Sequence, residues 1–312
     1  MPTLLIIGGT GFFGKSILDA YKRGLLSPWN IDKVIAMSRN ATKLEFKHPE
    51  LILDTVELLD GDISTVNFLP KSDYVIHAAA STNVSRYLRH NEEEKQNIIK
   101  GTLNYCRLAP KFHKNCKIVF CSSGAIYGYQ SKKVRYLTEG MAFGNIEKLD
   151  EVKKSYAYAK RDAELAIQKL GQVGLNVSVA RCFSFIGKYL PRDQHFAIGN
   201  FIADGLAGRD INIKADRKVY RSYMYADDLV VWLMSIANAS NKECPVYNVG
   251  SDVVIEIHEL AKLIADIFNV DVIQDKFKPL LVDKYIPSIK KAIKVLNVSN
   301  NHSFKDAILL NL

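Results

Sequence analysis

A glycine-rich segment near the N-terminus, residues 8–14, constrains the fold of this chain more than any other feature. It follows the apolar run 4–7 and precedes a helix-like stretch at 15–20, which is the strand–turn–helix context of a dinucleotide-binding loop. Glycines there permit a tight turn and close approach of a pyrophosphate, and the helix N-terminus offers N–H groups to the phosphates. The alternative is a glycine-rich turn without a ligand. The predicted loop residues are Gly8, Gly11, Phe12, Phe13 and Gly14.

The first half of the chain alternates between short apolar segments and helical ones. We expect strands at 4–7, 33–37, 56–59, 74–78, 117–121 and 176–180, with helices near 15–23, 92–108 and 156–170. Short apolar strands separated by helices indicate a parallel sheet covered on both faces. The predicted fold class is α/β, a doubly wound, Rossmann-like parallel sheet with its ligand crevice at the carboxyl ends of the strands.

The pattern changes after about residue 181. We expect helices at 196–207 and 256–268 and short strands at 210–214 and 270–273. We interpret this part as a smaller, partly interleaved α/β lobe that binds the substrate over the crevice. The predicted domains are 1–180 for the dinucleotide, with part of about 225–250 interleaved, and 181–312 mainly for the substrate.

Composition and charge narrow the class of protein. No apolar run reaches the ~18 residues of a membrane span, and the N-terminus lacks the features of a signal peptide, so we expect a cytoplasmic protein. Five scattered cysteines without a C-x-x-C pair argue against a disulfide framework and a zinc site, and no metal site is predicted. The net charge of +9 is dispersed, without a nucleic-acid motif. We expect an anionic substrate and cofactor, although surface lysines alone would give the same charge.

Tyr156 and Lys160 stand four residues apart in a predicted helix, so a phenol and an ammonium share one helix face. A nearby ammonium favours the phenolate and lowers the pKa of a tyrosine, which lets Tyr156 exchange a proton as a hydride moves. Tyr158 is the competing tyrosine, but its partner four residues on is Asp162. An unrelated, exposed Tyr/Lys pair is the alternative. Ser123, at the end of the fifth strand, is placed to hold a substrate oxygen.

Ser38 and Arg39 follow the second strand, where an acid would bind the ribose of NAD and an arginine accommodates the 2′-phosphate of NADP. NADP(H) is therefore favoured, with NAD(H) as the alternative, unless Arg39 is a solvated loop residue. Asp62 follows the third strand and is placed either to bond the adenine amino group or to form an Asx turn. The small residues Ala78 and Ala79 end the fourth strand, where they either leave room for the cofactor or fill a position that packing keeps small.

Taken together, these motifs resemble those of the extended short-chain dehydrogenase/reductases, the NAD(P)-dependent nucleotide-sugar epimerase/dehydratase group. The similarity covers nearly the whole chain. The matching segments are 8–14, Gly61-Asp62-Ile63, His77-Ala78-Ala79, Asn97 with Gly101-Thr102, 122–128, Tyr156 with Lys160, 181–187, 221–228, 247–250 and 286–292.

That resemblance implies roles for individual residues. The catalytic positions are Ser123, Tyr156 and Lys160. Ile63 and Asn97 match cofactor positions, and Arg221 matches an arginine that contacts a nucleotide diphosphate, with a structural salt bridge as its alternative. The family implies a nucleotide-diphosphate sugar as substrate and a homodimer formed through helices of the larger domain.

Departures from the family pattern favour one reaction over others. Family dehydratases place Asp-Glu after the catalytic Thr, whereas this chain has Gly124-Ala125, which argues against dehydration. Our leading hypothesis is NADPH-dependent reduction of a nucleotide-linked 4-keto-6-deoxyhexose. The alternatives are an NAD-dependent nucleotide-sugar 4-epimerase and a non-catalytic NADP-binding regulator. His195 is a candidate second acid in the substrate site, or else a packing or surface histidine.

Overall fold

The computed structural model describes residues 2–80, 84–131, 133–192, 196–274 and 277–310. A seven-stranded, wholly parallel sheet forms its larger part, in the order β11-β6-β5-β4-β1-β2-β3. The strands are β1 (Thr3–Ile7), β2 (Lys33–Ser38), β3 (Val56–Asp60), β4 (Tyr74–His77), β5 (Lys117–Ser123), β6 (Asn176–Cys182) and β11 (Val246–Val249). The strand order reverses between β1 and β4, which is where a doubly wound sheet places its ligand. The predicted fold class is confirmed.

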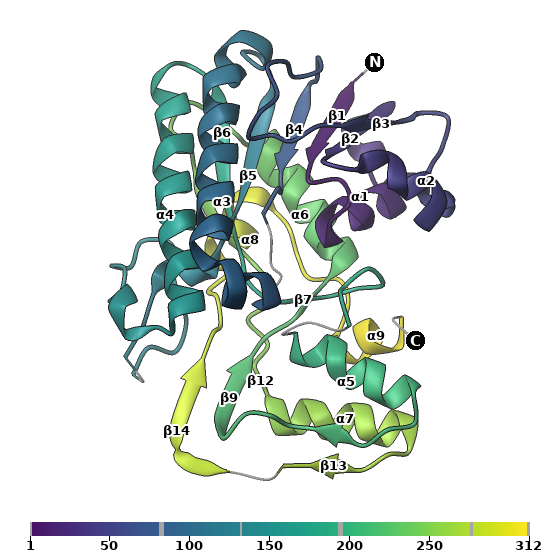
Figure 1. Cartoon of the computed structure of the whole chain (residues 1–312), viewed down its shortest axis with the longest axis vertical. Coiled ribbons are helices and arrows are strands. Elements are labelled where there is room, and N and C mark those ends of the chain that lie inside the picture. Colours follow the sequence, from purple (N-terminus) through teal and green to yellow (C-terminus); the bar gives the residue numbers. More distant parts are fainter. Residues whose placement is uncertain (1, 81–83, 132, 193–195, 275–276, 311–312) are drawn as a thin grey trace.

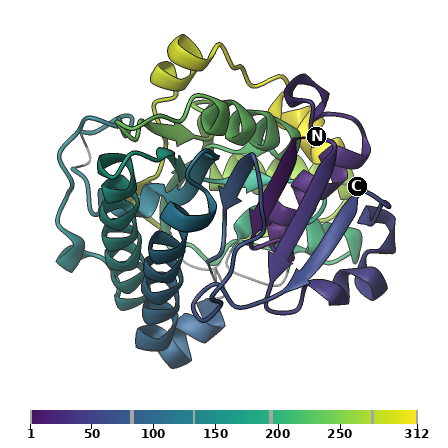
Figure 2. The same cartoon turned by 90° about the horizontal axis from the view of Figure 1, so that it is seen from above.

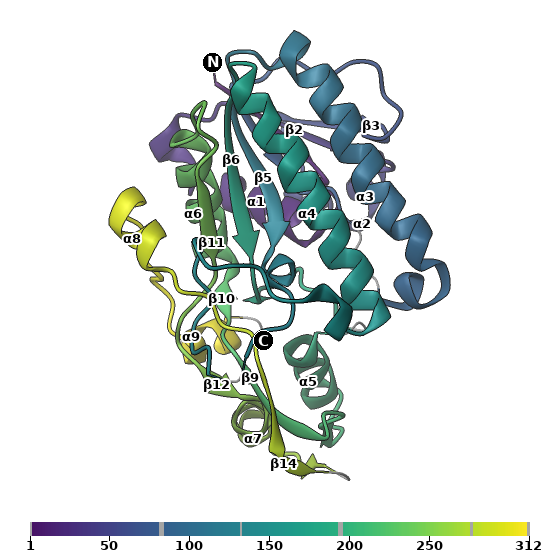
Figure 3. The ribbon, with the colours of Figure 1, turned by 90° about the vertical axis from the view of Figure 1, so that its left-hand side faces the viewer.

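Helices cover both faces of this sheet (Figures 1 and 2). One face carries α3 (Val84–Phe112) and α4 (Glu151–Gln172), which lie side by side (Figure 3), and the other carries α1 (Phe12–Lys22) and α6 (Ala226–Asn238). In β1, Leu4 and Ile6 join the core beneath α1 and α6, while Leu5 and Ile7 join the core beneath α3 and α4. Because both faces are buried, the strands read as continuous apolar runs.

The smaller lobe lies at the carboxyl ends of the strands and has a core of its own (Figure 1). Its helices are α5 (Ala197–Leu206), α7 (Ile257–Phe268) and α9 (Phe304–Leu309). A three-stranded sheet joins β12 (Ile255–Glu256), β9 (Arg217–Arg221) and β14 (Lys278–Lys284), and β8 (Ile211–Asn212) pairs with β13 (Val272–Ile273). A capping box between Glu256 and Glu259 starts α7. The chain returns to the larger sheet through α6, β11 and α8 (Lys290–Leu296).

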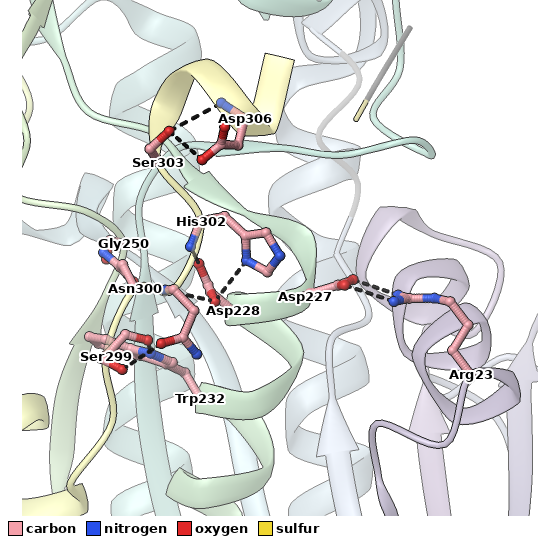
Figure 4. A network of polar contacts seen from close by, with 11 residues as sticks. Arg23, Asp227, Asp228, Trp232, Gly250, Ser299, Asn300, His302, Ser303 and Asp306 are labelled. Atoms are coloured by element: carbon pink, nitrogen blue, oxygen red, sulfur yellow. Dashed lines mark hydrogen bonds and ion pairs between the residues drawn. The ribbon is translucent and has the colours of Figure 1, made fainter. Parts of the chain in front are cut away.

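Two adjacent acids at the start of α6 tie distant segments together (Figure 4). Asp227 makes a bidentate ion pair with Arg23 at the end of α1, at 2.8 and 2.6 Å. The buried Asp228 carboxylate accepts hydrogen bonds from the backbone N–H groups of Asn301 and His302, and lies 3.1 Å from the His302 ring. These contacts fix the segment leading into α9. Within the described ranges, no helix has the length and apolarity needed to span a membrane.

Candidate functional site

The glycine loop lies against the exit of β4, with no room for side chains. Gly8 has a φ of +103°, and a Cβ there would lie 2.9 Å from the backbone of Ala78. A Cβ at Gly14 would lie 2.3 Å from the carbonyl oxygen of Gly9. Helix α1 begins after Gly11 without a side-chain cap, so its first N–H groups remain available to an anion. The loop therefore fits a dinucleotide pyrophosphate at the strand-order reversal.

The other predicted cofactor residues in this region act through backbone and shape. Phe12 and Phe13 pack their rings against each other and against Phe185, so only their N–H groups at the helix start face a phosphate site. Ile63 is a core residue beneath α3, and Ala79 packs against the same core. None of these four side chains carries a polar group, so they shape the site and leave recognition of the cofactor to other residues.

At the end of β2, the structure places Ser38 and Arg39 as predicted from the sequence. The Ser38 hydroxyl is buried and makes no hydrogen bond within the described residues, while Arg39 is exposed. The neighbouring acid is Asp60, paired in register with Ser38 on β3. Its carboxylate accepts hydrogen bonds from the Thr42 N–H (3.0 Å) and hydroxyl (2.7 Å), which lower the pKa of Asp60. The Asp60 carboxylate is therefore already hydrogen-bonded to Thr42 beside the proposed ribose site.

Two further predicted cofactor residues are Asp62, which follows β3, and Asn97, which lies on α3. The Asp62 carboxylate accepts hydrogen bonds from the Ser64 N–H (2.9 Å) and hydroxyl (2.8 Å), so the Asx turn forms and one carboxylate oxygen is engaged. Asn97 is exposed on α3, whereas the next residue, Ile98, is buried beneath the helix. A cofactor contact by Asn97 stays a prediction.

Ser123, Tyr156 and Lys160 come together at the carboxyl end of β5. Helix α4 is capped by Asp150, whose side chain accepts a hydrogen bond from the Lys153 N–H at 2.9 Å, and it carries Tyr156 and Lys160 on the face toward the sheet. The Lys160 Nζ donates to the Cys121 carbonyl oxygen at 2.9 Å and lies 5.8 Å from the centre of the Tyr156 ring. The three predicted catalytic side chains are thus neighbours.

The electrostatics of this cluster differ from the sequence-based expectation. Burial raises the pKa of Tyr156, and the neighbouring Ser123 hydroxyl acts in the opposite direction by hydrogen bonding. Burial also lowers the pKa of Lys160. The Lys160 ammonium donates to the Cys121 carbonyl oxygen, and burial has the largest influence on the pKa of Tyr156. Tyr156 is therefore a protonated phenol at neutral pH, suited to donating a proton.

The competing tyrosine, Tyr158, points away from this cluster. Its hydroxyl donates to Glu147 Oε1 at 2.6 Å on the protein surface, and that hydrogen bond raises the pKa of Tyr158. The two tyrosines are therefore distinguished by their positions on α4.

Sequence reasoning missed two aromatic residues that lie over Gly124. A Cβ at Gly124 would lie 2.6 Å from the Tyr285 hydroxyl oxygen and 2.7 Å from the Phe183 ring. The two rings pack with their centres 4.7 Å apart. Tyr285 follows β14 of the smaller lobe, and no local pattern in the sequence connects it with Ser123. Gly124 therefore has two effects. It leaves this position without the carboxyl group of the family dehydratases, and it makes room for the phenol of Tyr285.

Of the predicted substrate residues, Arg221 ends β9 and forms an ion pair with Asp283 of β14, with Nη2 2.9 Å from Oδ2. Its Nη1 also donates to the Tyr220 carbonyl oxygen at 2.9 Å. The salt-bridge interpretation of Arg221 is thus realised, and a role toward a diphosphate stays a prediction. His195 lies outside the described residues.

A dinucleotide-type glycine loop and a Ser/Tyr/Lys cluster on one Rossmann-like sheet are the combination expected of an oxidoreductase. The family model for the NAD dependent epimerase/dehydratase family matches residues 4–250. The chain therefore belongs to this family of enzymes.

Relatives and solved structures carry several activities on the same architecture. UDP-glucuronic acid decarboxylase 1 of Arabidopsis thaliana is 25% identical, covering 98% of this chain and 68% of the relative. CDP-paratose 2-epimerase of Salmonella typhi is also 25% identical, over 98% of this chain and 96% of the relative. The structure of UDP-glucose 4-epimerase from Thermotoga maritima has a TM-score of 0.81 at 23% identity, covering 99% of this chain and 97% of that one. At this identity, the structural likeness establishes the fold.

Proposed function

We propose that this protein is an NADP(H)-dependent oxidoreductase that reduces the keto group of a nucleotide-linked 4-keto-6-deoxyhexose. The observation that carries the proposal is the cluster of Ser123, Tyr156 and Lys160, together with the absence of a carboxyl group at Gly124 and Ala125. The bound cofactor supplies the hydride. Tyr156 donates the proton to the substrate oxygen, Ser123 binds that oxygen, and Lys160 binds the nicotinamide ribose.

The protonation state of Tyr156 supports reduction as the net reaction. A buried phenol with a raised pKa is a proton donor at neutral pH, and carbonyl reduction requires a donor. Dehydration removes a proton from one sugar carbon and a hydroxyl group from the next, so it requires a basic and an acidic side chain. Gly124 and Ala125 provide neither. The substrate class follows the relatives, several of which act on nucleotide sugars according to their names.

The direct test is incubation of the purified protein with NADPH and a panel of nucleotide-linked 4-ketosugars, with the products identified by mass spectrometry. We expect a product two hydrogen atoms heavier and stoichiometric consumption of NADPH. Tyr156→Phe should lower kcat by about a thousandfold, within the range for loss of a general acid. Tyr158→Phe is the matched control and should retain wild-type turnover, because Tyr158 faces solvent. Equal activity of Tyr156→Phe and wild type would refute the proposed proton donor.

A 4-epimerase is the second candidate, and the epimerase names among the relatives favour it. The same three side chains would then serve a transient oxidation followed by re-reduction. In that case the protein should retain tightly bound NAD through purification and should interconvert two nucleotide sugars without net consumption of cofactor. A protein that binds NADP(H) and turns over none of these substrates would support the non-catalytic regulator.

The preference for NADP(H) rests on the end of β2. Arg39 is exposed there, Ser38 presents a buried hydroxyl, and Asp60 is engaged by Thr42. We expect Arg39→Ala to reduce the NADPH-over-NADH ratio of kcat/KM by about tenfold, the cost of about 1.4 kcal/mol of phosphate binding. Lys43→Ala, on the following turn, is the control. A ratio unchanged by Arg39→Ala would remove the argument for NADP(H).

We further propose that the protein is a homodimer that buries the groove between α3 and α4. This groove has a volume of about 500 Å³, and its lining is mainly apolar but includes the charged side chains of Asp162 and Lys169. Leu103, Leu165 and Val173 are each more than half exposed there, and contiguous exposed apolar surface marks an interface. Leu165→Glu should convert the dimer to a monomer in light scattering after size exclusion. Phe46→Glu, at an exposed apolar residue on α2 (Leu44–Lys47), should leave the dimer intact.

A further inference from the structure

A buried polar network lies behind the strand end that carries Ser123. The short 3₁₀ helix η4 (Gly124–Tyr127) begins directly after Ser123 and ends at Tyr127. The fully buried Tyr127 hydroxyl donates to Asn248 Oδ1 on β11 at 2.7 Å and accepts from Arg181 Nη1 on β6 at 3.1 Å. Burial raises the pKa of Tyr127 to about 12, so the phenol stays a donor at neutral pH. Both ends of η4 are therefore fixed, one by β5 and the other by side chains of two further strands of the sheet.

One arm of this network reaches the catalytic helix α4. The Arg181 guanidinium forms a double contact with the Glu164 carboxylate, with Nε 3.2 Å from Oε1 and Nη2 2.9 Å from Oε2, and both side chains are buried. Glu164 follows Lys160 by four residues on α4, so these two side chains share one helix face. Arg161, also on α4, donates from Nε to the Ile126 carbonyl oxygen of η4 at 2.8 Å. Helix α4 thus holds η4 through two separate side chains.

The other arm reaches the segment that follows β14 of the smaller lobe. The Asn248 Nδ2 donates to the carbonyl oxygens of Leu137 at 2.8 Å and Ser288 at 3.2 Å. Because its Oδ1 accepts from the phenol, all these contacts agree with one orientation of the amide. Leu137 in turn bonds through its backbone to Ile286 at 2.9 Å and to Ser288 at 2.7 Å. Tyr285, whose hydroxyl lies over the start of η4, directly precedes Ile286.

We propose that Tyr127 is a positioning residue of the active site, because its hydroxyl holds η4 against β11 and β6 and thereby fixes Ser123 relative to Tyr156. The inference rests on the proposed function of Ser123 and Tyr156. A phenylalanine would fill the same buried volume, so apolar packing does not require the hydroxyl. Its contribution is geometric, since a displacement of about 1 Å at reacting groups can cost about a hundredfold in rate. The influence of Tyr127 on Ser123 passes through the backbone of η4.

Tyr127→Phe in the full-length enzyme removes the hydroxyl and keeps the ring. In a single turnover with enzyme in excess, we expect the rate constant for hydride transfer to fall by about tenfold, because Ser123 is displaced from the substrate oxygen. The substrate is whichever nucleotide sugar the wild-type enzyme turns over. Affinity for NADPH should change less than about twofold, because β4 and β5 separate the glycine-loop strand β1 from β6. Tyr129→Phe, at an exposed tyrosine, is the matched control.

Two comparisons separate positioning from a merely structural role. A loss of folded protein would lower the amplitude of the single turnover and leave its rate constant unchanged. In a Ser123→Ala background, Tyr127→Phe should slow hydride transfer by less than about threefold, since no serine hydroxyl remains to be positioned. An unchanged rate constant in Tyr127→Phe, or equal losses in the two backgrounds, would overturn the proposal. If Tyr127→Phe does not fold, Arg161→Met, which removes the contact with the Ile126 carbonyl, carries the same two expectations.

Hydrogen exchange tests the same link without a substrate, so that it remains decisive if the wild-type protein turns over no nucleotide sugar and the proposed function fails. The Gly128 N–H donates to the Ala125 carbonyl oxygen at 3.1 Å, and the Ala125 N–H donates to Ser123 Oγ at 3.2 Å. Both amides therefore report on the order of η4. Tyr127→Phe should speed exchange in a peptide covering 123–130 by at least about fivefold, while a peptide covering β1 keeps its rate. Unchanged exchange in 123–130 would contradict the proposal even if turnover were lost.

Discussion

The two lobes of this enzyme are built in different ways. The larger one is a seven-stranded parallel sheet whose neighbouring strands pair over four to seven residues. The smaller one has strands as short as two residues around a separate apolar core, with single polar contacts between strands such as Arg221 with Asp283. Regular repeated pairing suits a rigid cofactor site, whereas isolated contacts allow the substrate site to vary between relatives. The proposed catalytic residues Ser123, Tyr156 and Lys160 all come from the first lobe, and Tyr285 of the second places its hydroxyl over Gly124 beside them.

The largest effect that separates the lobes is expected at the glycine loop. A Cβ at Gly14 would lie 2.3 Å from the Gly9 carbonyl oxygen, so Gly14→Ala must displace α1 from the loop. We expect at least about a hundredfold loss of NADPH affinity, equivalent to about 3 kcal/mol, measured by isothermal titration calorimetry. Gly140→Ala is the control, because a Cβ there meets no atom within 4 Å. Tight binding by Gly14→Ala would show that the loop is not the pyrophosphate site.

The next effect concerns the attachment of the smaller lobe. Asp228→Ala leaves the N–H groups of Asn301 and His302 without their acceptor (Figure 4), and should lower the free energy of unfolding by about 2–3 kcal/mol. Asp227→Ala removes the ion pair with the half-exposed Arg23 and should cost less than about 1 kcal/mol. Urea unfolding measures both. Equal losses would mean that the C-terminal segment is held by other contacts.

The larger lobe could be predicted from the sequence because each of its elements has a local signal. Continuous apolar strands, the glycine loop and the alternation with helices all concern neighbouring residues, and β11 was the strand left unassigned. Helix α4 begins earlier than expected, at Glu151, because its first turns are polar and contribute little to an apolar pattern. Helix α3 begins at Val84 but has a break in its helical geometry at His90, so the part after the break starts close to the predicted residue 92.

The smaller lobe was less predictable because its strands are specified by distant partners. β9 and β14 carry few buried residues and pair with each other across more than fifty residues of sequence. For the same reason the sequence did not reveal Asp283 in β14 or Tyr285 directly after it. Motif order locates residues along the chain, but it does not identify the partner of a strand that pairs over a long sequence separation.

Acid sensitivity should distinguish the core of the larger lobe from the surface of the smaller one. His77 ends β4 fully buried, with both ring nitrogens lacking a hydrogen bond among the described residues. Burial lowers the pKa of His77 from 6.5 to about 3. The unfolded chain therefore binds a proton at His77 that the native protein excludes, so stability is complete above pH 6.5 and falls as the pH decreases toward 3.

From about pH 7 to about pH 5, this residue should lower the free energy of unfolding by about 2 kcal/mol. His77→Leu should remove that part of the pH dependence, while the buried His113, whose pKa burial also lowers, retains its own. The exposed His258 is the control, and His258→Gln should leave the slope unchanged. Urea midpoints at the two pH values measure the difference. An identical slope in His77→Leu would show that His77 is protonated in the native state.

The smallest expected effect concerns the predicted diphosphate contact in the smaller lobe. Arg221 is held by Asp283 and the Tyr220 carbonyl through its two terminal nitrogens, which leaves the Nε side of the guanidinium for a phosphate. Arg221→Met should raise KM for the nucleotide sugar by about tenfold, or about 1.4 kcal/mol, with kcat changed less than about twofold. Arg217→Met, on the same strand but in an exposed pair with Asp216, should leave KM within about twofold. If both variants keep the wild-type KM, Arg221 serves only as a salt bridge between β9 and β14. The diphosphate must then bind to the larger lobe, and the smaller lobe would not hold the nucleotide part of the substrate as the comparison assumes.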